Sequence, residues 1–256
     1  MKRGLRYGLW LAPFGELADA RLLAELGARA EAAGWDGLFV WDHVLFGDPG
    51  LPIADPWVTL AAVACATESI SLGTLVTPVA RRHVHKLARE TTTLDRLSGG
   101  RYILGVGLGS GSRDELGLDE TPVDPRERAR MLDAGLATLA GCWAGDLQPT
   151  PRRARIPVWV GSEWPHRAPL RRAARWDGWF PVGVDRPEDL AEGIAEISRL
   201  QAGRARMRFD VVVPGAPDDD SAGWEKAGAT WWLVGFGPNP RQGDVRFAIQ
   251  ALRQGR

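Results

Sequence analysis

Residues Ile70–Gly107, with the sequence ISLGTLVTPVARRHVHKLARETTTLDRLSGGRYILGVG, decide how this chain folds. Ile70–Val76 and Tyr102–Val106 are short apolar runs of the kind that form buried strands. Between them, Val84–Leu97 places apolar residues at helical spacing, and the segment Ser98-Gly99-Gly100 ends that helix. Strands joined by a helix pair in parallel, so this stretch predicts a βαβ unit.

The same alternation continues on both sides of that unit, and it yields eight strand–helix pairs. No Gly/Ser-rich or Pro-rich linker divides the chain, so residues 1–256 are predicted to form one domain. A closed eight-fold barrel needs about 250 residues. The predicted fold is therefore α/β, a single (β/α)8 TIM barrel with short insertions. Strands are predicted at Leu5–Leu11, Asp36–Trp41, Ile70–Val76, Tyr102–Val106, Ile156–Val160, Asp177–Pro181, Arg208–Val213 and Thr230–Val234. Helices are predicted at Leu17–Gly34, Asp55–Thr67, Val84–Leu97, Pro125–Trp143, Pro165–Arg175, Pro187–Gln201, Ser221–Ala227 and Asp244–Arg253.

The charge balance argues against two classes of partner. The chain carries 32 basic and 32 acidic side chains, a formal net charge of zero. Nucleic-acid binding usually needs a basic excess or stripe, and attachment to an anionic membrane needs a polybasic segment. No apolar run reaches the roughly 18 residues of a membrane span. The two cysteines, Cys65 and Cys142, lie in apolar helical stretches, so we expect no disulfide framework and a cytoplasmic location.

In such a barrel the active site lies where the strands end and the following loops begin. Asp42-His43 ends the second predicted strand, at that end of the barrel. Histidine is the side chain most easily tuned to exchange protons near neutral pH. We therefore predict His43 as a catalytic residue, with the adjacent Asp42 orienting it. The alternative is a surface-loop histidine beside an ordinary turn aspartate.

Two glycine-containing segments follow the fourth and fifth predicted strands. In Gly105–Ser112, glycines would let backbone amides approach an anion or a flat ring, although Ser110 leaves the dinucleotide pattern G-x-G-x-x-G incomplete. Gly161-Ser162-Glu163 precedes a predicted helix, where amides and a hydroxyl can bind phosphate. Taken alone, the two segments also fit a tight rim loop and a plain helix N-cap.

The segment Arg81-Arg82-His83-Val84-His85 after the third strand has three interpretations. It fits an anion-binding cluster, a His-x-His metal pair or the solvated start of a helix. A metal-dependent barrel hydrolase would use the four histidines, which are His43, His83, His85 and His166. No cysteine pair or His-Glu-x-x-His run supports a metal, so no metal site is predicted.

Most of the twelve tryptophans fall on predicted strands or helix faces, where we expect them to lie in the core. Trp164 is different because it follows the fifth predicted strand. From a loop at that end of the barrel, its ring would be placed to form one wall of a flat ligand pocket.

These motifs, in this order, strongly resemble the luciferase-like monooxygenase superfamily. The resemblance covers nearly the whole chain and weakens after about residue 205. The segments that carry it are Trp41-Asp42-His43, Asp55-Pro56-Trp57, Leu72–Pro78, Leu87–Glu90, Leu94–Gly107, Ile156–Gly161 and Ala173–Pro181.

The resemblance implies a (β/α)8 barrel that binds FMN or the deazaflavin F420 in reduced form. It implies that His43 lies near the reactive part of the ring, and the Asp-His pair favours F420. It also implies a non-proline cis peptide at the end of the third strand, at Leu75-Val76 or at the neighbouring Thr74-Leu75, behind the ring. The cofactor-binding residues it implies are Thr74, Leu75, Val76, Gly107, Gly109, Gly161 and Ser162. Because the net charge is zero, we expect the anionic cofactor to be held by amides and by arginines such as Arg81, Arg82 and Arg113.

The leading functional hypothesis is an oxidoreductase that transfers a hydride between F420 and a small organic substrate. The alternatives are a monooxygenase that uses FMNH2 and O2, and a non-catalytic flavin-binding relative. The chain is short for the family, and its brief loop after the seventh strand implies an open or minimal substrate pocket. Dimers are common in the family, so a homodimer is one expectation, although no interface can be identified from the residues.

Overall fold

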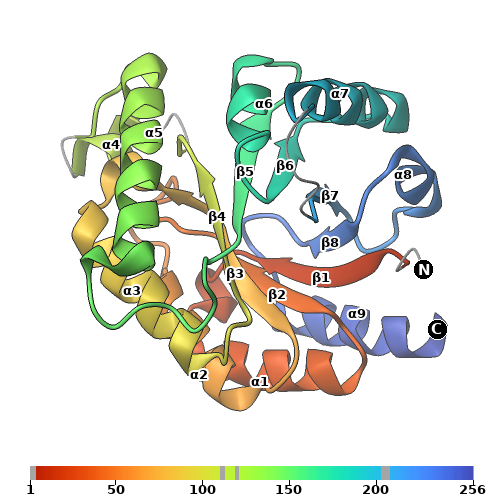
Figure 1. Ribbon diagram of the computed structural model, residues 1–256. Helices are drawn as coiled ribbons and strands as arrows, with labels where there is room; N and C mark the ends of the chain where they lie inside the picture. Colours follow the sequence, from red (N-terminus) through yellow and green to blue (C-terminus); the bar gives the residue numbers. More distant parts are fainter. Residues whose placement is uncertain (1–3, 110–112, 119–120, 203–207, 256) are drawn as a thin grey trace.

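The computed structural model describes residues 4–109, 113–118, 121–202 and 208–255, and in them eight parallel strands close into a barrel in the order β1-β2-β3-β4-β5-β6-β7-β8 (Figure 1). The closing pair aligns Gly8 of β1 with Leu233 of β8. The predicted (β/α)8 barrel is confirmed. The strands are β1 (Arg6–Leu11), β2 (Gly37–Val40), β3 (Ser71–Pro78), β4 (Tyr102–Gly107), β5 (Val158–Glu163), β6 (Gly178–Val182), β7 (Asp210–Gly215) and β8 (Trp231–Gly235).

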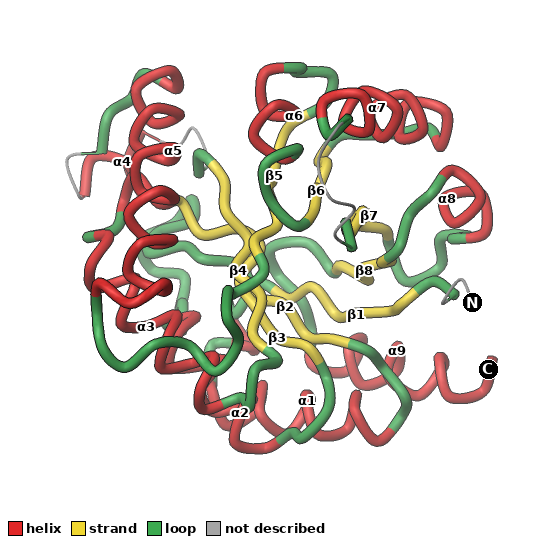
Figure 2. The backbone as a smooth tube through the Cα atoms, in the orientation of Figure 1, coloured by secondary structure: helices red, strands yellow, loops and turns green. Residues whose placement is uncertain are grey.

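The helices form a layer outside the strands, as the red and yellow segments of Figure 2 show. In the described part of the chain, every helix falls short of the length and hydrophobicity needed to cross a membrane. The helices are α1 (Ala20–Ala32), α2 (Pro56–Ala66), α3 (Val84–Leu97), α4 (Arg113–Leu118), α5 (Pro125–Gly141), α6 (Ala168–Ala173), α7 (Pro187–Leu200), α8 (Ala222–Ala227) and α9 (Gln242–Gly255).

The helix starts follow from local hydrogen bonding. Asp55 caps α2, because its Oδ1 accepts from the amides of Trp57 at 2.9 Å and Val58 at 2.8 Å. Asp124 caps α5 in the same way through Arg126 N. Both helices begin with proline, whose missing N–H removes a donor that would otherwise have no helical partner.

The structure differs from the predicted elements in three places. The first helix is split into a 3-10 turn, Gly15–Leu17, and α1. The fourth long helix ends at Gly141 and continues as a π-helical turn, Cys142–Asp146. The short helix α4 was not predicted. It lies in the loop after β4 and supplies one residue of the candidate site.

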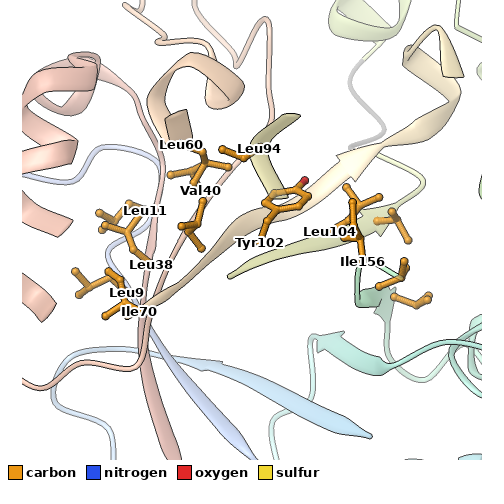
Figure 3. Packing of buried hydrophobic residues seen from close by; sticks show 14 of the residues in the cluster. Leu9, Leu11, Leu38, Val40, Leu60, Ile70, Leu94, Tyr102, Leu104 and Ile156 are labelled. Carbon is orange, nitrogen blue, oxygen red and sulfur yellow. The ribbon is translucent and has the colours of Figure 1, made fainter. Parts of the chain in front are cut away.

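Two apolar clusters hold the fold together. The larger one lies between the strands and the helices, where Leu38, Val40 and Tyr102 meet Leu60 of α2 and Leu94 of α3 (Figure 3). The smaller cluster fills the inside of the barrel. Its buried members are Phe39, Leu75, Ile103, Trp159, Phe180, Val212, Trp231 and Leu233.

Glycines on the barrel strands make room for the aromatic rings inside the barrel. The rings of Phe39, Trp159 and Trp231 pack with centroids 5.1 to 5.6 Å apart. A Cβ at Gly178 would lie 2.4 Å from Cδ1 of Trp159, and one at Gly37 would lie 2.8 Å from Cε2 of Phe39. Larger residues at these two positions would therefore displace the rings.

At the opposite end of the barrel from the predicted site, Glu31 of α1 binds the turn before β3. Its Oε1 accepts from the Ser69 hydroxyl at 2.7 Å and from the Ile70 amide at 3.0 Å, and the amides of Glu68 and Ser69 also donate to it. Burial opposes ionisation of Glu31, but these donors outweigh it and lower the pKa to about 2.

We expect Glu31→Gln to lower the free energy of unfolding near neutral pH by about 1–2 kcal/mol, because charge-assisted bonds to the turn are lost. Since the folded-state pKa is lowered, this stabilisation is complete above about pH 4.5 and is lost as pH falls toward about 2. Urea unfolding across that range measures it, with Glu163→Gln, an exposed carboxylate on β5, as control. A difference from wild type that does not change with pH would contradict this role.

Candidate functional site

His43 lies just beyond β2, at the carboxyl ends of the strands, inside a group of aromatic side chains. Its ring centroid is 5.2 Å from that of Phe46, 5.9 Å from that of Phe14 and 6.0 Å from that of Trp41. The side chain is 16% exposed. The ring is therefore largely shielded by apolar neighbours but still reached by solvent.

The partner of His43 is Glu115 of α4. His43 Nδ1 lies 2.9 Å from Oε2 and 3.1 Å from Oε1 of this carboxylate. Because an ionised carboxylate only accepts hydrogen bonds, Nδ1 carries the proton, and Nε2 is left as the nitrogen that can gain or lose one. Glu115 Oε1 also accepts from the Val44 amide at 2.8 Å, which fixes the loop after β2 to α4.

Glu115 is ionised despite its burial. Desolvation raises the pKa of this carboxyl group, but the hydrogen bond and charge of His43, the charge of Arg81 and the Val44 amide outweigh it and lower the pKa to about 2. A fixed negative charge therefore faces Nδ1 of His43 over the whole physiological pH range.

Sequence reasoning missed Glu115 because the predicted glycine-rich loop was taken to contain no helix. One signal was present: Ser112-Arg113-Asp114-Glu115 matches the S-x-x-E pattern that often starts a helix. Ser110, Gly111 and Ser112 of the predicted run lie outside the described residues, as does the side chain of Arg113.

The prediction that Asp42 orients His43 is wrong. The Asp42 carboxylate is fully buried and pairs with two arginines of the loop after β3: with Arg81, at 2.9 Å from its Nη2, and with Arg82. Successive residues of an extended chain point to opposite sides, so adjacent Asp42 and His43 face different surroundings. Arg82 in turn lies over the Trp57 ring of α2, which places Asp42 on the helix side of the barrel wall.

From the zero net charge we expected Arg81 and Arg82 to help bind an anionic cofactor. The structure shows instead that both guanidinium groups are already paired with carboxylates. The Arg81 side chain is 3% exposed and is shared between Asp42 and Glu115. Arg82 pairs with Asp42. Both positive charges are already balanced by carboxylates, so neither is a free partner for a phosphate.

The peptide bond between Leu75 and Val76 is cis, the first of the two positions that the resemblance implied. Trp10 Nε1 donates to the Leu75 carbonyl at 3.0 Å. Thr74 and Leu75 are buried, and the Thr74 hydroxyl accepts from Thr77 at 2.8 Å. Of the three predicted ring contacts Thr74, Leu75 and Val76, only Val76 is partly exposed. It lies at the carboxyl end of the barrel, which we call the mouth.

Gly107 and Gly161 flank Val76 on the neighbouring strands. A Cβ at Gly107 would lie 2.6 Å from Cγ2 of Val76, and one at Gly161 would lie 2.7 Å from Cγ1. Gly109 has φ +83°, and a Cβ there would lie 2.9 Å from Cβ of Pro78. Packing of the Val76 side chain therefore requires glycine at 107 and 161, whether or not a phosphate approaches them.

Ser162 does not stand at a helix N-terminus, contrary to the prediction. It lies within β5, and α6 begins only at Ala168. Its hydroxyl accepts from Trp179 Nε1 at 2.8 Å. Trp164 lies against the outer layer, with its ring 6.2 Å from that of Trp179 and with Arg167 stacked at 4.5 Å, so it does not form a wall at the mouth.

The remaining histidines, His83, His85 and His166, are exposed. The ring contacts of His43 within the described residues are to Phe14, Trp41 and Phe46. Among the described residues, no three side chains of His, Cys, Asp or Glu are grouped so that they could hold a metal ion.

A groove of about 830 Å³ lies on the outside of the barrel and extends to the loops after β7 and β8. It is bordered by Tyr7 of β1, Trp232 of β8 and Phe247 of α9. It contains none of the predicted site residues, so size alone does not identify the site. His43 lies instead at the carboxyl ends of the strands, away from this groove.

The residues at the mouth have the chemistry to contact a flat heteroaromatic ring. Trp10, Trp41 and Val76 are half-buried apolar surfaces at this end, above an interior that is already filled. The Trp41 indole N–H is buried and has no hydrogen-bond partner among the described residues, which leaves a donor for a ring carbonyl. Trp10 and Trp41 lie 5.1 Å apart with an interplanar angle of 41°.

Comparison with known proteins matches residues 8–253 to the model of the luciferase-like monooxygenase family. The chain is 31% identical over 228 residues to the F420-dependent glucose-6-phosphate dehydrogenase of Microbacterium testaceum, covering 78% of this chain and 66% of that protein. Among solved structures, the F420-dependent tetrahydromethanopterin reductase of Methanopyrus kandleri superposes with a TM-score of 0.79 at 18% identity, covering 98% of both chains. The oxygenating constituent of 3,6-diketocamphane monooxygenase from Pseudomonas putida, in complex with FMN, superposes with a TM-score of 0.70 at 17% identity, covering 84% of this chain and 67% of that chain.

We expect Gly107→Ala to lower the free energy of unfolding by about 1–3 kcal/mol, because the added methyl group overlaps Val76. The combined variant Gly107→Ala/Val76→Ala should lose less than the sum of the two single variants. Urea unfolding of the four proteins measures this coupling. Gly243→Ala, whose Cβ meets nothing within 4 Å, serves as control. Purely additive losses would show that Val76 is not what requires the glycine.

Proposed function

The chain belongs to the luciferase-like monooxygenase family, and from that premise we propose that it is an oxidoreductase that uses F420 to transfer a hydride to or from a small organic substrate. The observation that carries the proposal is His43, whose Nδ1 is held by ionised Glu115 beside a half-open apolar mouth. Such a histidine can take up or release a proton through Nε2 while a hydride moves.

Each part of the mouth has a task in this proposal. Val76 and Trp10 offer an apolar surface for the face of the ring, and the Trp41 N–H offers a donor to its edge. Phe14 and Phe46 limit the access of water to His43. When bound, the deazaflavin supplies the hydride-transfer chemistry. The chain's own contribution is to orient the ring and to exchange a proton at Nε2 of His43.

The choice of F420 over FMN rests on two supports. The sequence has Asp-His at the end of the second strand, which is typical of F420-using members of the family. The relative from Microbacterium testaceum is also named as an F420-dependent dehydrogenase. An FMNH2-dependent monooxygenase is the second candidate, favoured by the similarity to an FMN-bound oxygenase component.

Side-by-side fluorescence titration with F420 and FMN tests the cofactor assignment. We expect F420 to bind with a dissociation constant at least about tenfold lower, a difference of about 1.4 kcal/mol. A preference for FMN, followed by oxygen consumption with FMNH2, would favour the monooxygenase instead. Tight F420 binding with no turnover of alcohols, sugar phosphates or enones would indicate a non-catalytic relative.

The role of His43 is tested by His43→Ala. We expect turnover to fall about 10²–10⁴-fold, the usual contribution of a proton-transferring side chain, with the dissociation constant of F420 nearly unchanged. His166→Ala, which removes an exposed histidine from the loop after β5, is the matched control. If the His43 variant turns over like wild type, this residue does not move the proton.

A further inference from the structure

An unbroken series of ion pairs leads from the helix layer to His43. Arg82 pairs with Asp42, and Asp42 pairs with Arg81 at 2.9 Å. Arg81 Nη1 then pairs with Glu115 Oε1, and Glu115 Oε2 faces His43 Nδ1 at 2.9 Å. The side chains of Asp42, Arg81 and Glu115 are each at most 3% exposed, so water screens these charges weakly.

The charges of this series cancel only while His43 is neutral. Two carboxylates and two guanidinium groups sum to zero, and a proton on His43 adds one positive charge. Glu115 is the anion that would stabilise that proton, but it is shared with Arg81, whose charge is permanent. Arg81 therefore competes with protonated His43 for the same carboxylate.

Among the described residues, the rings packed against His43 are uncharged. The loop after β1 presents Phe14 to it, and the loop after β2 presents Trp41 and Phe46. Within the described residues, the charged groups linked to His43 are Glu115 directly, Arg81 through Glu115, and then Asp42 and Arg82 behind them.

We propose that Arg81 is a positioning residue that sets the proton affinity of His43 through Glu115, keeping Nδ1 protonated and Nε2 free to exchange at neutral pH. This inference rests on the proposed function for its catalytic meaning. Arg81 acts on the histidine from the next strand–helix loop, through the carboxylate alone. Its guanidinium helps to keep Glu115 ionised and pairs with the same carboxylate that faces His43 Nδ1.

A purely structural role for Arg81 is the competing explanation. Its Nη2 also donates to the Asp42 carbonyl at 2.8 Å, which ties the loop after β3 to the end of β2. Loss of that tie would lower stability without changing the titration of His43 in a fixed direction. The two explanations therefore differ in whether replacing Arg81 shifts the protonation of His43 in a fixed direction.

Proton–nitrogen correlation NMR of the histidine rings reads that proton directly. The chain has four histidines, and His83, His85 and His166 are exposed, so they act as internal references. His43→Asn identifies the remaining signal. In the cofactor-free wild type we expect the tautomer with the proton on Nδ1.

The proposal predicts opposite shifts for two neutralising variants. Arg81→Gln should raise the pH midpoint of His43 by about one unit or more, because the competing cation is gone, and Glu115→Gln should lower it by a similar amount. Arg81→Lys, which keeps the charge, should stay close to wild type. Once the cofactor is identified, turnover can be measured against pH. The midpoint of its acidic side should be highest in Arg81→Gln, intermediate in wild type and lowest in Glu115→Gln.

The outcomes separate this inference from the proposed function. Unchanged midpoints in all variants, or shifts of the same sign for Arg81→Gln and Glu115→Gln, would overturn the role of Arg81 even if turnover depends on His43. If Arg81→Gln does not fold, Arg81→Lys and Glu115→Gln still decide, since an unmoved midpoint in Glu115→Gln excludes the route through Glu115. Shifts as expected with turnover independent of His43 would uphold the electrostatic coupling and reject the catalytic role.

Discussion

The architecture depends on how the inside of the barrel is filled. Trp159, Trp231 and Phe39 occupy it, and they fit because the strand positions beside them, such as Gly37 and Gly178, carry no side chain. This plug closes the barrel below its carboxyl end. A ligand therefore has no room inside the barrel, and at the carboxyl end it would rest on side chains that cover these rings.

Glycines also leave space for a neighbouring side chain at the candidate site. Gly107 and Gly161 leave the space in which Val76 sits, so the apolar floor of the mouth is an extension of the packed interior. On one side of that floor stands His43, shielded by aromatic rings and bound to a buried carboxylate. Apolar support for a ring and a single polarised proton carrier are what a hydride-transfer cofactor needs from a protein, because the cofactor supplies the reactive bond.

The sequence was informative where local patterns decide structure. Helix α3 has the predicted bounds, Val84–Leu97, because its apolar spacing and its glycine ending are both local signals. The sequence alone could not identify the partner of His43. Glu115 is 72 residues away and lies on a six-residue helix, so only the closed barrel brings the two together. Asp42 was assigned to the histidine by adjacency, yet neighbours in an extended segment face opposite ways, and its charge serves Arg81 and Arg82 instead.

The central claim is that the mouth beside His43, and no other surface of the barrel, receives the cofactor. The groove bordered by Tyr7, Trp232 and Phe247 is a clear competing location, since it is large and partly aromatic. A crystal structure of the protein with bound F420 tests the claim most directly. We predict the deazaflavin ring in contact with Val76 and Trp10, with Nε2 of His43 at its edge. A ring bound in the outer groove, or at the mouth but out of reach of His43, would contradict the account.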